Sequence, residues 1–305
     1  MILVFGTLCV DRVRSVDHLP APGGYVEIAE ERILLGGEAA NTANALHQWG
    51  HELIVTGNGL GDGRLRNMVQ ERNLPYHSIS IPDPDFIAPI CDIYVTPDGE
   101  RTMFGAGFKN AGDALNLSEI PFKAGEWFTS EPNMELPSRA AVRLAQEAGM
   151  KIYLMDFIRP DDPIAPGSFW QCSTDWAGYR SNTQRNVRWV KEFVENHGCF
   201  AILSDGPNGF VAGSPELPVR AYPPFPAPEV VDTTGAGDMF RAGMLHGLDQ
   251  NWPIARCLQF ASVAGCLKCK SLGATTYVPT VAEIEAFLAL NQDVAGQYWP
   301  ATSSL

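Results

Sequence analysis

The chain has 305 residues, of which 45% are hydrophobic and 19% charged, a composition typical of a globular protein with a sizeable core. Its formal net charge is −13, which argues against the broad basic surface of nucleic-acid binders and disfavours binding to anionic membranes. No apolar run reaches the roughly 20 residues needed to span a bilayer, and the N-terminus lacks a secretory pattern. Because the seven cysteines are also an odd number, we expect a cytoplasmic protein with reduced thiols.

Apolar runs and amphipathic stretches alternate along the chain from the N-terminus onward. Strands are expected at 1–8, 52–57, 151–156 and 200–204, and helices at 38–49, 62–73, 139–149, 186–196, 236–248, 253–269 and 280–290. Residues 157–180 are rich in Pro, Asp, Trp and Gly and are expected to form an irregular loop. The alternation predicts an α/β fold with a mainly parallel sheet covered by helices on both faces.

Two segments in the N-terminal part interrupt this alternation. Residues 12–32 are of mixed composition, and residues 90–106 have the pattern of a hairpin with Asp98-Gly99 at its turn. Together they predict a small β-sheet that stands off the main domain as a lid. Surface loops on a single domain are the alternative interpretation.

The segment with the clearest chemical meaning is Asp232-Thr-Thr-Gly-Ala-Gly-Asp238, which joins a short apolar run to a helical pattern. Small residues at a helix N-terminus leave backbone N–H groups accessible, and these groups with the helix dipole bind anions such as phosphate. Asp238 falls in the first helical turn, where a carboxylate can accept a proton from an attacking hydroxyl group. From composition alone, a tight turn followed by a favourable first-turn acid explains the segment equally well.

This segment resembles the C-terminal signature of the ribokinase (PfkB) family of carbohydrate kinases. In that family the last Asp is the catalytic base and the Gly-Ala-Gly amides form an anion hole. The resemblance therefore implies catalytic roles for Asp238, Gly235, Ala236 and Gly237. It also implies that the whole chain, 1–305, is a single ribokinase-like domain, a three-layer α/β/α fold with a small β lid. Lid-to-lid dimers occur in the family, so a homodimer through the lid is one expectation.

On the substrate side, Gly36-Gly37 leads into a helical pattern that contains Asn41, and Asp11 follows the first strand. Both segments resemble family motifs that contact sugar hydroxyl groups. Gly37 permits close approach of the backbone, Asn41 offers a donor and an acceptor, and the Asp11 carboxylate accepts O–H groups well. The resemblance implies that these three residues bind substrate, with a packing turn and a solvated strand end as the alternatives.

Three further substrate-binding candidates rest on weaker matches. The segment around Arg101 resembles the family's lid hairpin, although a solvated hairpin charge explains it equally well. Glu131 follows a strand-like run, at a place where family members can touch the sugar. Asp156-Phe-Ile-Arg159 is similar to the Asp-x-Asn-x-Arg run of some sugar-acid and hexose kinases, with Ile in place of the Asn, so Arg159 is the third candidate.

The nucleotide side also matches the family. Ser204-Asp-Gly206-Pro-Asn-Gly209 resembles a Thr-x-Gly-x-x-Gly turn that holds ATP phosphates, and Ser keeps the hydroxyl group of the Thr. The helix that contains Ser262 and the turn at Gly273 resemble the lining of the adenine pocket. The resemblance therefore implies ATP as the phosphoryl donor, bound through these five residues.

Two cations also follow from the resemblance. Many members hold a monovalent cation such as K⁺ with oxygens at the positions of Asp232, Thr234 and Gly273. For Mg²⁺ the family carries Asn-x-x-Glu, and the match here is Asn182-Thr-Gln-Arg185, in which the Glu is missing. Asn182 is therefore expected at the nucleotide site, and the organisation of Mg²⁺ is expected to differ from that of the family.

The sequence thus predicts an ATP-dependent kinase that phosphorylates a hydroxyl group of a sugar or sugar-like molecule, with Asp238 as general base. Fructose, ribose, a sugar acid, a sugar phosphate and a nucleoside stay open as substrates, although few basic residues match substrate-facing positions. The alternative from another class is a non-catalytic sugar or nucleotide sensor, motivated by the missing Glu. No P-loop, dinucleotide-binding, zinc-protease or serine-hydrolase motif occurs in the sequence.

Overall fold

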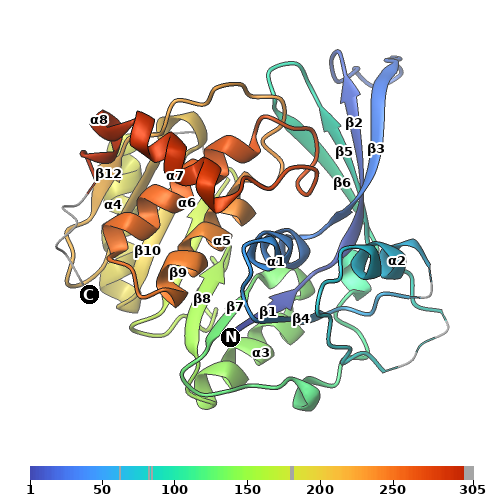
Figure 1. Cartoon of the computed structure of the whole chain (residues 1–305). Coiled ribbons are helices and arrows are strands. Elements are labelled where there is room, and N and C mark those ends of the chain that lie inside the picture. Colours follow the sequence, from blue (N-terminus) through green and yellow to red (C-terminus); the bar gives the residue numbers. More distant parts are fainter. Residues whose placement is uncertain (62, 82, 84, 179–181, 299–305) are drawn as a thin grey trace.

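An eight-stranded sheet forms the centre of the molecule (Figure 1). The computed structural model describes residues 1–61, 63–81, 83, 85–178 and 182–298. The strands, in the order in which they lie in the sheet, are β12 (Arg220–Tyr222), β11 (Phe210–Gly213), β10 (Phe200–Ser204), β9 (Phe169–Ser173), β8 (Lys151–Met155), β7 (Trp127–Ser130), β1 (Ile2–Gly6) and β4 (Leu53–Gly57). From β4 to β10 all neighbours pair in parallel, and β11 and β12 extend the sheet antiparallel. The predicted mainly parallel sheet is confirmed.

Helices cover both faces of this sheet, because its inner strands are buried on both sides. In β1 the side chains of Ile2 and Val4 enter one hydrophobic core with α1, α5 and α6, whereas Leu3 and Phe5 enter a second core with α3 and α4. The helices are α1 (Glu38–Gln48), α2 (Arg64–Glu71), α3 (Leu136–Glu147), α4 (Thr183–His197), α5 (Ala236–Asp249), α6 (Ile254–Lys268), α7 (Val281–Leu290) and α8 (Gln292–Ala295), with short 3-10 helices η1 (Phe108–Asn110), η2 (Leu117–Glu119), η3 (Pro132–Met134) and η4 (Gly206–Asn208). The expected three-layer α/β/α architecture is the one observed.

A second, four-stranded sheet stands to one side of the main sheet (Figure 1). Its strands, in spatial order, are β3 (Ile28–Gly36), β2 (Cys9–Val16), β5 (Ile90–Val95) and β6 (Arg101–Ala106). Its small core packs Cys9 and Val13 against Leu272, in the turn after α6. Both segments expected to form a separate sheet, 12–32 and 90–106, contribute strands to this one sheet, although residues 17–27 form the connection between β2 and β3. The action of the sheet as a lid stays a prediction.

The loop expected at 157–180 is wrong in part, because Phe169–Ser173 forms strand β9 in the middle of the main sheet. This strand carries a buried Gln171, which interrupts the apolar pattern in the sequence. Gln171 accepts a hydrogen bond from Tyr153 Oη at 2.7 Å and donates one to the Gly237 carbonyl at 2.9 Å. A side chain of a central strand is therefore bonded directly to the first turn of α5.

The seven cysteines are free thiols in the described part of the chain. Burial raises the pKa of each of them, so none is activated as a nucleophile. They act instead as small apolar groups in the interior. Of the described helices, none has the length and apolar composition that crossing a membrane requires.

Replacing Gln171 with Leu should lower the free energy of unfolding by about 2–6 kcal/mol, because two buried groups would each lose a partner at a cost of about 1–3 kcal/mol. Urea unfolding followed by tryptophan fluorescence measures the difference. Gln250→Leu changes an exposed position and is the matched control, expected to stay within about 0.5 kcal/mol of the wild type. If both variants unfolded at the same urea concentration, the two hydrogen bonds of Gln171 would have no part in stability.

Candidate active site

The turn before α5 keeps backbone amides accessible. Gly235 is the N-cap residue of α5 and adopts a φ of +79°, a left-handed conformation that favours glycine. The Ala236 amide donates to the Thr233 carbonyl at 3.1 Å, whereas the amides of Gly235 and Gly237 have no acceptor among the described residues. Of the three amides expected to form an anion hole, the Ala236 amide therefore already has an acceptor within the turn.

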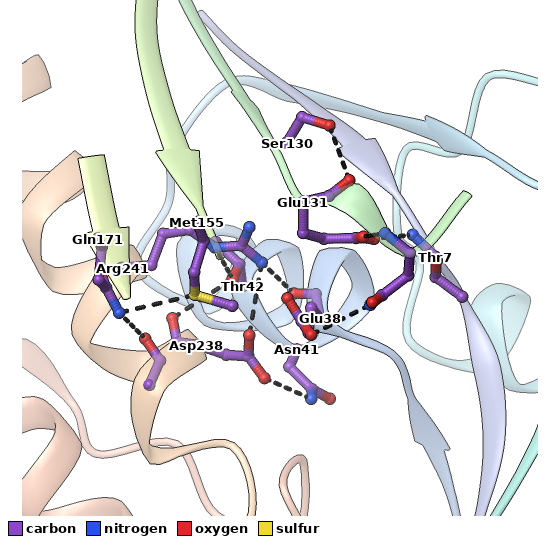
Figure 2. A network of polar contacts seen from close by, with 12 residues as sticks. Thr7, Glu38, Asn41, Thr42, Ser130, Glu131, Met155, Gln171, Asp238 and Arg241 are labelled. Atoms are coloured by element: carbon purple, nitrogen blue, oxygen red, sulfur yellow. Dashed lines mark hydrogen bonds and ion pairs between the residues drawn. The ribbon is translucent and has the colours of Figure 1, made fainter. Parts of the chain in front are cut away.

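Asp238 lies in the first turn of α5 with only 6% of its surface exposed. Its carboxylate accepts a hydrogen bond from Asn41 Nδ2 at 2.8 Å and lies 3.4 Å from Arg241 Nη2 (Figure 2). Burial raises the pKa of Asp238, and the charge of Arg241 and the bond from Asn41 counteract this rise. The result is a carboxylate held between two partners and more basic than one in water.

Arg241 was missed by sequence reasoning, although a charged residue in the middle of an apolar helix is a recognisable signal. Its side chain is fully buried, Nε donates to Thr42 Oγ1 at 2.8 Å, and Nη2 donates to the Glu38 carbonyl at 2.5 Å. These bonds attach α5 to α1 and fix the guanidinium group beside Asp238 (Figure 2). Arg241 is therefore an internal counter-charge for the candidate base.

Several polar atoms around Asp238 are buried without a partner among the described residues. They are Asn41 Oδ1, Glu38 Oε2 and Arg241 Nη1. Buried polar atoms in folded proteins nearly always have a hydrogen-bond partner, so three such atoms close together suggest a site for a polar ligand. Both donor and acceptor atoms are present, as recognition of hydroxyl groups requires.

Asp11 brings a carboxylate from the second sheet toward the same region. Only 3% of it is exposed, and Cys9 Sγ donates to its Oδ1 at 3.1 Å. Burial raises the pKa of Asp11 to about 7, and the negative charges of Asp238 and Asp232 add to this rise. A Cβ on Gly36 would come within 2.0 Å of the Asp11 carboxyl carbon, so this glycine makes room for the carboxylate.

Two further buried acids, Glu38 and Asp156, lie in the same region as Asp238. Burial raises the pKa of Asp156 to about 7, and the charges of Asp238 and Glu131 contribute to the rise. Burial also raises the pKa of Glu38 well above its usual value, and the negative charges of Asp156 and Glu131 add to this rise. Burial and mutual repulsion favour the neutral form of these acids, and an additional anion among them would be unfavourable wherever they ionise.

Gly37 and Asn41 both start α1 but have different roles. Gly37 has a φ of +91°, and a Cβ there would lie 2.2 Å from the Thr7 carbonyl oxygen. A tight packing turn is therefore enough to explain this glycine. Asn41 instead contacts Asp238 directly and keeps its Oδ1 free of partners among the described residues.

Glu131 and Arg159 bond to other residues of the chain, and their contact with substrate stays a prediction. Glu131 is fully buried, and its carboxylate accepts hydrogen bonds from the backbone amides of Thr7 and Asn133 (Figure 2). Its side chain therefore connects the residue after β1 to η3. Arg159 is 56% exposed and forms two bonds to Glu135, at 2.6 and 2.9 Å, on the rim of an open pocket of about 400 Å³.

Arg101 reaches from β6 to the turn before α5. Its Nη1 donates to Thr233 Oγ1 at 2.9 Å, and Thr233 Oγ1 donates to the Gly99 carbonyl at 3.1 Å. The alternative of a solvated hairpin charge is therefore wrong, since Arg101 connects the second sheet to the segment that carries the candidate base.

The residues expected on the nucleotide side lie on separate elements. Ser204 ends β10, and its Oγ donates to a carbonyl of β9 at 3.3 Å. Gly206 and Gly209 follow with φ of +50° and +87°, as a tight turn requires. Ser262 lies on α6 beside Tyr298.

Asn182 is the N-cap of α4, and its Oδ1 accepts from the Arg185 amide at 3.0 Å. It lines an open pocket of about 410 Å³ at the start of this helix. The described first turn of α4 contains no acidic residue that could take the place of the missing Glu.

The oxygens of Asp232 are all occupied by N–H donors. Its carboxylate accepts from the amides of Thr234, at 2.8 Å, and Gly273, at 2.6 Å, and its carbonyl accepts from Lys268 Nζ at 3.0 Å. Because Lys268 already places a positive charge against the Asp232 carbonyl, a second cation such as K⁺ would be repelled, and these residues do not fit it. Lys268 was missed in the sequence because a lysine in the last turn of a helix is common and needs no special partner.

Replacing Asp11 with Asn should flatten the pH dependence of stability. The pKa of Asp11 is about 7 in the folded chain against an ordinary value of 3.8, so the folded chain binds more protons between these values and its stability falls as pH rises through this window. The slope from one such group is at most about 1.4 kcal/mol per pH unit. Asp11→Asn should therefore be more stable than the wild type at pH 8 and equally stable at pH 4.

Urea unfolding at a series of pH values tests this expectation. Asp17→Asn is the matched control, because the Asp17 side chain is 90% exposed. Parallel stability curves for Asp11→Asn and the wild type would contradict the raised pKa.

Comparison with known proteins gives a consistent assignment. A model of the pfkB family of carbohydrate kinases matches residues 174–281. An uncharacterized sugar kinase of Dictyostelium discoideum is 30% identical, with 95% of this chain and 98% of that protein covered, and the ribokinase of Bacillus subtilis is 24% identical, with 94% and 99% covered.

Solved structures agree with these relatives. The ribokinase from Giardia lamblia superimposes with a TM-score of 0.77 at 16% identity, covering 95% of this chain and 99% of that one. A Burkholderia thailandensis nucleoside kinase in complex with inosine has a TM-score of 0.71 at 20% identity, with 96% and 97% covered. These likenesses confirm the ribokinase-like fold. Together with the relative that matches along almost its full length, they establish that the chain belongs to the pfkB family of carbohydrate kinases.

Proposed function

We propose that this chain transfers the γ-phosphoryl group of ATP to a hydroxyl group of an uncharged sugar or nucleoside. The observation that carries the proposal is the buried carboxylate of Asp238 beside the accessible amides of Gly235 and Gly237. Phosphoryl transfer needs a group that accepts the proton of the nucleophile and an anion site next to it. Both lie within one helical turn in this chain.

In the proposed reaction Asp238 accepts the proton of the acceptor hydroxyl group, and the oxygen of that hydroxyl group attacks the γ-phosphorus atom. The bond between that phosphorus and the bridging oxygen of ADP breaks, and ADP leaves. The N–H groups of Gly235 and Gly237 and the dipole of α5 stabilise the negative charge on the moving group. Asn41 and Arg241 hold Asp238 in position, and the proton passes from Asp238 to solvent when the product leaves.

The charge distribution supports a neutral substrate. A sugar phosphate or sugar acid would bring a further negative charge toward Asp11, Glu38 and Asp156. Arg241 and Arg159 already pair with carboxylates of the chain. Hydroxyl groups are well suited to the Asp11 carboxylate and Asn41 Oδ1, both of which accept hydrogen bonds.

For the nucleotide, we propose that ATP lies along the carboxyl ends of the parallel strands, where open α/β sheets bind their ligands. Its contacts would be Asn182, Ser204, Gly206, Gly209, Ser262 and Gly273. Mg²⁺, bound to ATP, would neutralise charge on the β- and γ-phosphate oxygens. No residue is assigned to Mg²⁺, since the described first turn of α4 offers no carboxylate.

The second sheet is proposed to close over the substrate as a lid. Its support is the bond from Arg101 to Thr233, which ties this sheet to the turn before α5. Met103 and Phe104 of β6 are 53% and 59% exposed, an apolar surface that suits the homodimer expected through this sheet. Dimerisation itself stays a prediction.

The missing acid at the start of α4 favours a second candidate, a non-catalytic sensor of sugars or nucleotides. A panel that contains ribose, fructose, a sugar acid, a sugar phosphate and purine nucleosides separates the two. The kinase proposal expects ADP release and a phosphorylated neutral substrate, both read by mass spectrometry. Calorimetric binding of a panel member without any ADP release would favour the sensor.

Asp238→Asn should lower turnover by about 10²–10⁴-fold, the usual contribution of a general base. The variant keeps the size of the side chain and its bond with Asn41, so substrate binding should change much less than turnover. Steady-state kinetics with the best panel substrate measures both. Asp293→Asn, at an exposed position in α8, is the control and should behave as the wild type. Near-normal turnover of Asp238→Asn would refute the assignment of the base.

A further inference from the structure

Lys268 is a buried lysine in the last turn of α6, and the proposed chemistry does not use it directly. Its side chain is fully buried, and Nζ donates to the carbonyl oxygens of Asp232, at 3.0 Å, and Ser271, at 3.5 Å. Lysine is almost never fully buried unless its charge is compensated. Packing alone therefore does not explain why a lysine is buried at this position.

The ammonium group lies between two turns that meet beneath the anion site. The Asp232 carboxylate accepts a hydrogen bond from a backbone amide of each turn, that of Thr234 before α5 and that of Gly273 after α6. A Cβ on Gly235 would lie 2.6 Å from a side-chain carbon of the second turn, so the two turns are also in direct contact. Lys268 adds a further link, because it binds a carbonyl oxygen from each turn.

The surroundings of Lys268 compensate its positive charge. The Asp232 carboxylate and the negative end of the α6 dipole are both adjacent. Burial lowers the pKa of Lys268, and the charge of Asp232 acts in the opposite direction. The charge of Lys268 also contributes to lowering the pKa of Asp238, after the larger effects of Arg241, Asn41 and Arg101. The ammonium group therefore acts on both the shape and the electrostatics of the site.

We propose that Lys268 is a built-in monovalent cation: its ammonium group holds the turn that presents the Gly235 and Gly237 amides, and the enzyme works without K⁺. Lys268 is in this sense a positioning residue, and its effect on catalysis rests on the function proposed above. K⁺ binds carbonyl oxygens in proteins, and Lys268 donates to such oxygens while carrying the same charge. Thr234 Oγ1 is buried without a partner among the described residues, but Asp232 offers no oxygen without a donor beside it.

The first arm of the test exchanges the cation around the wild-type protein. Melting temperature and ADP formation are measured in KCl and in tetramethylammonium chloride of equal ionic strength, since tetramethylammonium is too large for a site of this kind. We expect both quantities to stay the same, with turnover within about twofold. A loss of more than tenfold in turnover, or a clear fall in melting temperature without K⁺, would overturn the proposal.

The second arm removes the ammonium group. Lys268→Ala leaves space for an ion, so its turnover should fall at least tenfold in tetramethylammonium and recover saturably with K⁺, which should also raise its melting temperature. Lys268→Met fills the space with an apolar chain and should not respond to K⁺. Lys270→Ala, at a partly exposed lysine two residues further on, is the matched control and should behave as the wild type.

The two arms separate this proposal from the proposed function. If no substrate were phosphorylated, the kinase proposal would fail, and the melting temperatures of wild type and Lys268→Ala in the two salts would still decide the role of Lys268. A Lys268→Ala protein that keeps its turnover and melting temperature without K⁺ would overturn the inference. If that variant did not fold, the cation exchange on the wild type would decide alone.

Discussion

The candidate site depends on one constraint, that the buried carboxylate of Asp238 must be compensated. A carboxylate removed from water is unfavourable unless hydrogen bonds and opposite charge replace its hydration. Asn41 of α1 supplies the hydrogen bond, and Arg241 of α5 supplies the charge, held in place by its bonds to Thr42 and Glu38 of α1. The contact between the two helices is therefore as much a part of the site as the acid itself.

The same constraint explains why the site concentrates negative charge that is costly for folding. Asp11, Glu38 and Asp156 are each shifted toward the protonated form by burial and by their neighbours. A chain selected for stability alone would replace such groups, and their presence is a common sign of a functional site. Their arrangement favours a ligand that brings hydroxyl groups and no additional negative charge.

Much of the architecture could be predicted from the sequence because it depends on local patterns. Alternating apolar runs and amphipathic stretches gave the parallel sheet and the main helices, and the glycines before Asp238 indicated an anion site at a helix N-terminus. Strand β9 was missed because Gln171 is polar and finds its partners in Tyr153, on the neighbouring strand, and in Gly237, far along the chain. Pattern alone could not locate those partners.

The parts of the site that escaped prediction share this dependence on distant contacts. Arg241 bonds to Thr42, 199 residues away, and Lys268 bonds to Asp232, 36 residues away. Glu131, for which substrate contact stays a prediction, accepts hydrogen bonds from the backbone amides of Thr7 and Asn133, and the sequence did not indicate these partners. A residue type indicates which bonds a side chain can make, and the fold decides which of them it makes.

The most direct test of the account is a crystal structure with a substrate and a non-hydrolysable ATP analogue bound. The account predicts the acceptor hydroxyl group within about 3.2 Å of the Asp238 carboxylate, with the γ-phosphate facing the Gly235 and Gly237 amides. A substrate whose hydroxyl groups all lie out of reach of Asp238, or a γ-phosphate bound away from the start of α5, would contradict it.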